Sequence, residues 1–129
     1  MRNLFRVALV GMLSVTTLWV GAAAAMAADP VIAEGTCSQG STWKLEATPD
    51  EGLIEVEFGV DSEVAGESWG VALLDNRQPF FAQRVTTDEK GDYAVSAFAT
   101  DQSGDDRIRA VTRNRTTGEV CTGLVIVPA

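Results

Sequence analysis

The chain has 129 residues, of which 18 are acidic and 10 are basic, so its formal charge at neutral pH is −8. A surface of this sign is repelled by nucleic acids and by anionic membranes, which makes both unfavourable partners. The sequence contains no histidine, which excludes histidine-based catalytic triads and zinc sites built on imidazole.

Residues 1–27 have the organisation of a secretory signal peptide. Arg2 and Arg6 precede an apolar run that begins at Val7, and small residues follow as a cleavage site, which fits best after Ala27. The alternative is a retained anchor, because the 21 residues from Val7 to Ala27 are long enough to cross a bilayer. We expect cleavage, which leaves no membrane span and changes the formal charge from −8 to −10 because both arginines are removed.

The two cysteines, Cys37 and Cys121, lie near the two ends of the exported part of the chain. Export brings both thiols into an oxidising compartment, so we expect a disulfide, with two free buried thiols as the alternative. On the chain-entropy model, a bridge that closes so long a segment stabilises the folded state by roughly 4 to 5 kcal/mol.

From Ser41 onward the sequence predicts a series of short antiparallel strands. Apolar and polar residues alternate with a period of two, so each strand is expected to bury one face. Clusters of glycine, proline, asparagine and aspartate separate the strands and supply turns. The expected strands cover residues 41–47, 53–60, 68–75, 80–86, 93–99, 107–113 and 120–127. Seven strands in about 100 residues indicate an all-β, two-sheet antiparallel sandwich over residues 41–129, preceded by an N-terminal segment at 28–40.

Two stretches resemble known kinds of protein. The run "TTDEKGDYAVSAFATDQSGDDRIRAVTRNRTTGEVC" resembles the second half of bacterial extracellular immunoglobulin-like domains, with a T-x-x-x-G-x-Y turn, a D-x-x-G turn and a closing T-G-E strand. The stretch from Cys37 to Asn76 is similar to small secreted actinobacterial proteins of unassigned activity. This resemblance implies that the antiparallel β-sandwich is immunoglobulin-like, and it says little about function. Because the first and last segments of such sandwiches often lie side by side, it also implies that the bridge pins the N-terminal segment to the final strand.

No enzyme or cofactor motif stands out in the sequence. Neither glycine-rich phosphate-binding pattern, G-x-x-x-x-G-K-[ST] or G-x-G-x-x-G, occurs. A disulfide would also leave no thiol nucleophile. Glu55 and Glu57 could act as paired glycosidase carboxylates, but both fall on the predicted solvent face of a strand. We therefore expect no catalytic residue, no cofactor and no enzyme activity.

The segment "DQSGDD" brings together three carboxylates, those of Asp101, Asp105 and Asp106. Their order does not match the D-x-[DN]-x-[DN]-G loop of calcium sites, so we expect no metal site. The favoured interpretation is a turn in which Gly104 adopts a positive φ and Asp101 accepts backbone hydrogen bonds.

The positions of the aromatic residues indicate whether the protein could be a carbohydrate-binding module, because such modules require exposed flat rings. Trp43 and Trp69 are each in phase with apolar neighbours, so we expect both indoles in the core. Phe80 and Phe81 are consecutive, and because successive strand residues face opposite ways, one ring should leave the core. Next to Pro79, that ring would either anchor a partner or lie under a loop.

A second candidate surface is a stripe of arginines. Arg107, Arg109, Arg113 and Arg115 alternate, interrupted at that phase only by Val111. One interpretation is an ordinary solvated face whose arginine stems cover apolar neighbours. The other is a docking surface for an acidic partner, either a wall polymer or the acidic side of another copy. The charge is uneven enough for the latter, since residues 29–75 carry 11 acids against Lys44 alone.

The sequence therefore predicts a secreted, non-enzymatic module that binds a partner or a component of the cell envelope. Its ligand stays open among a cell-wall polymer, a polysaccharide and another protein. A carbohydrate-binding module is the first alternative, and a small enzyme or inhibitor of unrecognised type is the second. The candidate binding residues are Phe80, Phe81, Arg107, Arg109, Arg113 and Arg115.

Overall fold

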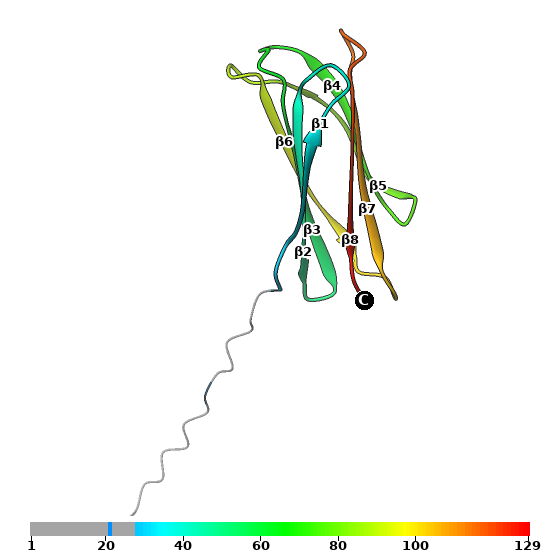
Figure 1. The fold of residues 1–129 in the computed structure, drawn as a ribbon. Helices are drawn as coiled ribbons and strands as arrows, with labels where there is room; N and C mark the ends of the chain where they lie inside the picture. The colour runs from blue at the N-terminus through cyan, green and yellow to red at the C-terminus, as the bar shows by residue number, and fades with distance from the viewer. Residues whose placement is uncertain (1–20, 22–27) are drawn as a thin grey trace, which may run out of the picture.

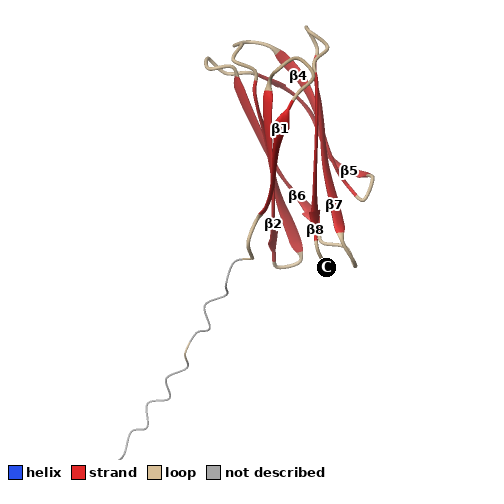
Figure 2. Ribbon diagram, in the orientation of Figure 1, coloured by secondary structure: helices blue, strands red, loops and turns tan. Residues whose placement is uncertain are grey.

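The computed structural model describes Gly21 and residues 28–129, so the predicted signal peptide, apart from Gly21, lies outside the described residues. In the described part, eight antiparallel strands form two four-stranded sheets that pack face to face (Figures 1 and 2). The strands are β1 (Val31–Thr36), β2 (Thr42–Asp50), β3 (Leu53–Asp61), β4 (Ser68–Asp75), β5 (Gln78–Thr86), β6 (Asp92–Thr100), β7 (Asp106–Asn114) and β8 (Val120–Val127). These residues include no helix that is long and apolar enough to cross a bilayer. The predicted all-β sandwich is confirmed.

The two sheets have the strand orders β1–β2–β3–β6, here called sheet 1, and β5–β4–β7–β8, here called sheet 2. The chain changes sheet between β3 and β4, between β5 and β6, and between β6 and β7. Without β1, three strands face four, in the order that strands A, B and E have opposite C′, C, F and G in immunoglobulin-like domains. The additional strand β1 extends sheet 1 at its edge.

Strand β1 lies in the segment that was predicted to precede the sandwich. It pairs with β2 from Val31, opposite Ala47, to Thr36, opposite Thr42. Its alternation is weak in the sequence because an apolar residue, Ile32, faces outward with 49% of its surface exposed. The boundary at residue 40 was therefore placed too late, since residues 31–36 already belong to a sheet.

The indole of Trp43 fills the space between the two edge strands β1 and β8. A Cβ atom at Gly35 would lie 2.6 Å from Trp43 Cζ2, and one at Gly123 would lie 2.7 Å from Trp43 Cζ3. Both strands therefore need glycine where the ring passes, because a real Cβ at such a distance would overlap it. Trp43 is half-buried and packs against the core, close to its predicted place.

The core lies between the sheets and consists of the inward residues of the alternating pattern. Trp69, on β4, is completely buried, and its ring centroid lies 5.8 Å from that of Tyr93. The Tyr93 hydroxyl donates a hydrogen bond of 2.6 Å to Thr112 Oγ1, which donates in turn to the Gly70 carbonyl. The prediction that Trp69 belongs to the core is confirmed.

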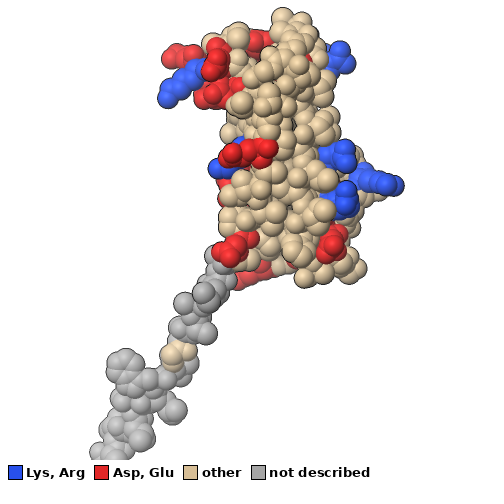
Figure 3. Space-filling model, viewed as in Figure 1, with Lys and Arg blue, Asp and Glu red and all other residues tan. Residues whose placement is uncertain are grey.

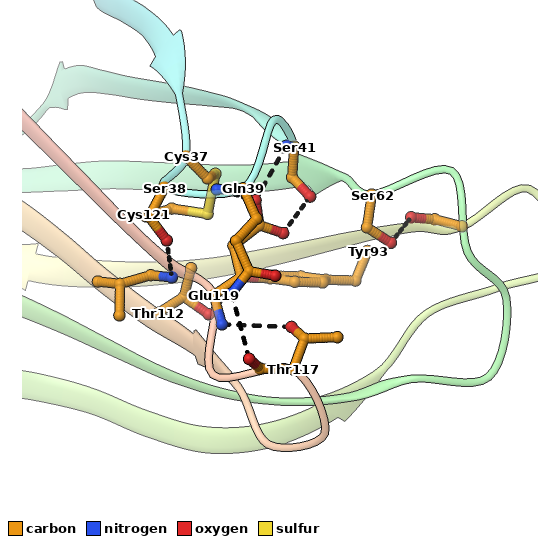
Figure 4. Close-up of a disulfide and its surroundings, with 12 residues drawn as sticks. Cys37, Ser38, Gln39, Ser41, Ser62, Tyr93, Thr112, Thr117, Glu119 and Cys121 are labelled. Carbon is orange, nitrogen blue, oxygen red and sulfur yellow. Dashed lines mark hydrogen bonds between the residues drawn. A yellow bond between two sulfur atoms is a disulfide. The ribbon is translucent and has the colours of Figure 1, made fainter.

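The predicted disulfide joins Cys37, in the turn after β1, to Cys121 on β8, with the two Cα atoms 4.4 Å apart (Figure 4). Beside it, the Ser38 backbone N–H donates to the Val120 carbonyl at 2.9 Å. The bridge thus fastens the β1–β2 turn to the last strand and ties sheet 1 to sheet 2 along one side. A bond of this kind fits an oxidising compartment.

Candidate binding face

The outward face of sheet 2 is basic and otherwise small or apolar. Alternation along β7 points Arg107, Arg109 and Arg113 outward, and Arg84 on β5 points the same way. Their outward neighbours on β4 and β8 are Gly70, Ala72, Leu74, Val120, Thr122, Leu124 and Ile126. None of the outward residues of the four strands is acidic. We call this surface, with its four arginines and with Arg77 at its rim, the arginine face; Figure 3 shows basic side chains gathered on this side of the molecule, over β5 and β7.

The strand register sets the arginines among apolar neighbours. Arg109 lies directly between Leu74 on β4 and Leu124 on β8. Arg84 and Arg113 both pair with Gly70, which lies between them and has no atom within 4 Å of the place its Cβ would take. Arg84 and Arg113 therefore flank a position that has no side chain and open space above it.

A pocket of about 460 Å³ lies at one end of this face, lined by Leu74, Asn76, Arg77, Arg107, Arg109 and Leu124. Its corner is fixed by Asn76, whose backbone N–H donates to the Arg107 carbonyl while its Oδ1 accepts from the Arg107 N–H at 2.9 Å. Asn76 and Arg77 have φ values of 47° and 72°. Two-residue hairpin turns with two positive φ values favour Asn-Gly, so an arginine at the second position carries some strain and projects a guanidinium beside the pocket.

The predicted arginine stripe is only partly correct. Strand β7 ends at Asn114, so Arg115 lies in the following hairpin, where its N–H donates to the Ser68 carbonyl at 2.8 Å. Arg107, Arg109 and Arg113 share the face as predicted. The sequence analysis missed Arg84 and Arg77. They lie near the arginines of β7 because β4 pairs with both β5 and β7, and a strand order of this kind cannot be predicted from a single sequence.

The prediction that one of the two phenylalanine rings leaves the core is wrong. A bulge shifts the register so that Leu73 pairs with Phe81 while Leu74 pairs with Pro79, which makes Phe80 the extra residue. A bulge interrupts strict alternation, and both rings are half-buried and packed against the core. Neither offers a freely exposed ring.

The outward face of sheet 1 has the opposite charge. Its acids are Glu34, Glu46, Asp50, Glu55, Glu57, Asp61 and Asp92, and its one basic residue is Lys44. We call this surface the acidic face. Glu55 and Glu57 lie on it as predicted. In Figure 3 acidic side chains predominate on this side, away from the arginines.

Two carboxylate pairs on the acidic face lie directly opposite each other on neighbouring strands. Glu46 on β2 pairs with Glu57 on β3, and Asp61 on β3 pairs with Asp92 on β6. Like charges at directly opposite positions destabilise a sheet. A hydrogen bond with the Asp61 carboxyl, together with burial and repulsion from Asp61, raises the pKa of Asp92.

A buried pair of carboxyls closes the opposite end of the core from the disulfide. Asp75, at the end of β4, is 3% exposed, and Asp106, at the start of β7, is fully buried. Burial, a hydrogen bond with Asp106 and repulsion from Asp106 and Asp101 raise the pKa of Asp75 to about 7. No pattern in the sequence indicates this raised pKa, and the low exposure of both carboxyls closes them to a substrate.

The "DQSGDD" segment forms the expected turn, with Gly104 at a φ of 83°. Within the turn, the Asp106 carboxylate, rather than that of Asp101, accepts a hydrogen bond from the Gln102 N–H at 3.1 Å, and the Asp105 carboxylate accepts one from the Ala129 N–H at 3.1 Å. Within the described part of the chain, no group of three or more acidic or cysteine side chains is placed to hold a metal ion.

Glu119 clamps the turn beside the disulfide (Figure 4). Its carboxylate accepts hydrogen bonds from the Gln39 N–H at 2.8 Å, from the Ser41 N–H at 3.0 Å and from the Ser41 hydroxyl. Burial alone would raise the pKa of Glu119, but these hydrogen bonds outweigh it and lower the pKa. The clamp is structural, because all of its partners belong to the turn that the bridge already fastens.

Comparison with known protein families, curated proteins and solved structures finds no match to this chain. The resemblance to bacterial immunoglobulin-like domains therefore rests on its turn and strand motifs alone and stays a prediction.

Proposed function

We propose that the chain is a secreted, non-enzymatic interaction module of the cell envelope that binds an acidic partner through the arginine face. The observation that carries this proposal is the one-sided charge. Although the chain has a formal charge of −8, the outward residues of the four strands of sheet 2 include four arginines and no acid. Charged residues that served only to keep the surface soluble would not need to be separated by sign in this way.

The chemistry of the face suits a protein-like or polymeric carboxylate partner. Guanidinium groups are weakly hydrated and bind carboxylates through two parallel hydrogen bonds. Interfaces are enriched in arginine, and their central residues are more apolar than their rims. Arg109, set between Leu74 and Leu124, combines both features and is the expected centre of binding.

Several features support a non-enzymatic role and export. The sequence has no histidine, and both cysteines are consumed by the disulfide. Asp75, whose pKa is raised to about 7, is closed to substrates by its burial. The signal-peptide pattern and the disulfide both support an exported protein.

The carbohydrate-binding alternative receives less support. Such modules present flat aromatic rings, whereas Trp69 is entirely buried and Trp43 lies in the space that Gly35 and Gly123 leave free. Phe98, 56% exposed, stands on the acidic face without a second exposed ring beside it in the strand register. An acidic partner is therefore the better-supported ligand.

The test is retention of the exported protein on an isolated cell-envelope preparation. Arg109→Glu reverses one charge at the centre of the arginine face, and Lys44→Glu makes the same change on the opposite face as a matched control. We expect Arg109→Glu to weaken retention at least tenfold and Lys44→Glu to leave it unchanged. Retention should also fall between 0.1 M and 1 M salt, where the Debye length shrinks from about 10 Å to about 3 Å. Unchanged retention of a folded Arg109→Glu variant would refute the proposal.

A further inference from the structure

The two broad faces of the sandwich complement each other. The arginine face presents Arg84, Arg107, Arg109 and Arg113 without an acid, and the acidic face presents seven carboxylates against Lys44. Both faces also expose apolar side chains. These are Ile32, Leu53 and Phe98 on the acidic face and Val120 and Ile126 on the arginine face. Charge and apolar surface therefore match at the same time.

The centre of the acidic face has more carboxylates than cations. Glu46 and Glu57 stand directly opposite each other, although a sheet gains stability when such a pair has opposite charges. These two carboxylates, with Lys44, rim a hollow of about 340 Å³ over Gly59, which has no side chain to fill it. A guanidinium group entering this hollow would relieve the repulsion and occupy the space.

We propose that the arginine face of one copy stacks on the acidic face of a second copy, so that the chain assembles head to tail. The inference rests on the proposed function, because it names the partner of the arginine face. A hydrophilic anionic polymer would match the arginines but leave Leu74, Leu124 and Ile126 without apolar contacts. The acidic face supplies both kinds of contact.

The size of the faces limits how much surface the contact can bury. Four strands spaced about 4.8 Å apart and about eight residues long cover roughly 500 Å². Stacking two such faces buries about 1,000 Å², at the lower limit for a specific interface. We therefore expect a weak, salt-sensitive association with a dissociation constant between about 1 µM and 1 mM.

The geometry also sets the form of the assembly. The two faces lie on opposite sides of the sandwich and belong to different sheets (Figure 1), so the contact joins two different surfaces. A contact of this type continues from copy to copy unless a rotation closes it into a ring. The expected product is a row that lengthens with concentration, not a dimer.

The experiment measures molar mass by sedimentation and light scattering from about 1 µM to 1 mM in low and high salt. Wild type should grow beyond a dimer at low salt and return to monomer at 1 M salt. Arg109→Glu blocks the arginine face, and Glu57→Lys blocks the acidic face while converting the Glu46 pair into an attractive one. Each variant alone should stay monomeric. Arg115→Glu makes the same change as Arg109→Glu but lies in the hairpin after β7, outside both faces, so this matched control should assemble as wild type does.

An equimolar mixture of the two blocked variants gives the decisive result. One intact acidic face meets one intact arginine face, and the two reversed charges are also opposite in sign, so the mixture should associate although neither variant does so alone. A wild type that stays monomeric throughout, or a mixture that stays monomeric, overturns the inference. The proposed function can hold even when this inference fails. If Glu57→Lys and wild type bind the envelope preparation equally and neither self-associates, the arginine face has another partner.

Discussion

Asp75→Asn should stabilise the protein at neutral and alkaline pH. Asp75 Oδ1 and Asp106 Oδ2 are buried without a hydrogen-bond partner when both carboxyls are ionised. A proton held between the two carboxyls satisfies both, which is why burial and the neighbouring Asp106 raise the pKa of Asp75 to about 7. The remaining groups that face Asp75 are Asp101, which adds repulsion, and the Gln102 amide, which donates only a long bond of 3.5 Å.

The sign and size follow from proton linkage. The folded state holds the Asp75 proton up to about pH 7, whereas the unfolded chain releases it near pH 3.8. The folded state therefore carries more protons between these values, and the free energy of unfolding falls as pH rises through this window. A tenfold change in proton affinity corresponds to about 1.4 kcal/mol, so the loss from pH 5 to pH 8 is on the order of 3 kcal/mol. Asparagine cannot ionise, and its amide can donate to Asp106.

The assay is urea denaturation followed by tryptophan fluorescence, because Trp69 is buried only in the folded state. We expect the variant to exceed wild type by on the order of 2 to 3 kcal/mol at pH 8 and to match it more closely at pH 5. Asp50→Asn, which removes an exposed carboxylate, should change stability at pH 8 by no more than about 0.5 kcal/mol. A wild type whose stability does not fall between pH 5 and pH 8, or a variant less stable than wild type at pH 8, would refute the reasoning.

Two further predictions concern the seam between β1 and β8. Replacing Cys37 and Cys121 with serine should lower the free energy of unfolding by about 4 kcal/mol in urea denaturation, since the unfolded chain loses its long closed loop; a loss below about 1 kcal/mol would contradict this. Gly123→Ala should destabilise by about 1 to 3 kcal/mol, because its Cβ would lie 2.7 Å from the Trp43 ring, whereas Gly70→Ala, in open space, should be nearly neutral. Equal melting temperatures for the two alanine variants would argue against the packing of Trp43.

Most of the fold could be predicted from the sequence because inward and outward residues alternate regularly along most of the strands from β2 to β8, with β5 as the exception. Strand β1 was not predicted because its outward Ile32 and inward Gly35 break that pattern. The inward position of Gly35 makes sense only once Trp43 of the neighbouring strand is seen to fill it. The expectation that either Phe80 or Phe81 leaves the core failed for a related reason, because a bulge depends on the pairing of two strands and leaves no mark in either sequence alone.

The candidate site could be predicted only along single strands. Alternation on β7 brought Arg107, Arg109 and Arg113 to one face, since that pattern is local. Their neighbours Leu74 and Leu124 come from β4 and β8, and Arg84 lies one strand further away. The raised pKa of Asp75 likewise needs Asp106, which is distant in the sequence and adjacent only in the folded state.

The separation of charge between the faces follows from the order in which the chain builds its sheets. The acid-rich stretch, residues 29–75, first forms β1, β2 and β3, which are all in sheet 1, and only its last residues form β4 in sheet 2. The outward residues of β4 are small or apolar, so this crossing carries no acid onto the other face. Of the later strands only β6 returns to sheet 1, and it adds Asp92 there. The later basic residues of β5 and β7 consequently all lie on sheet 2, and an uneven charge along the sequence becomes opposite charges on two surfaces that can face each other in neighbouring copies.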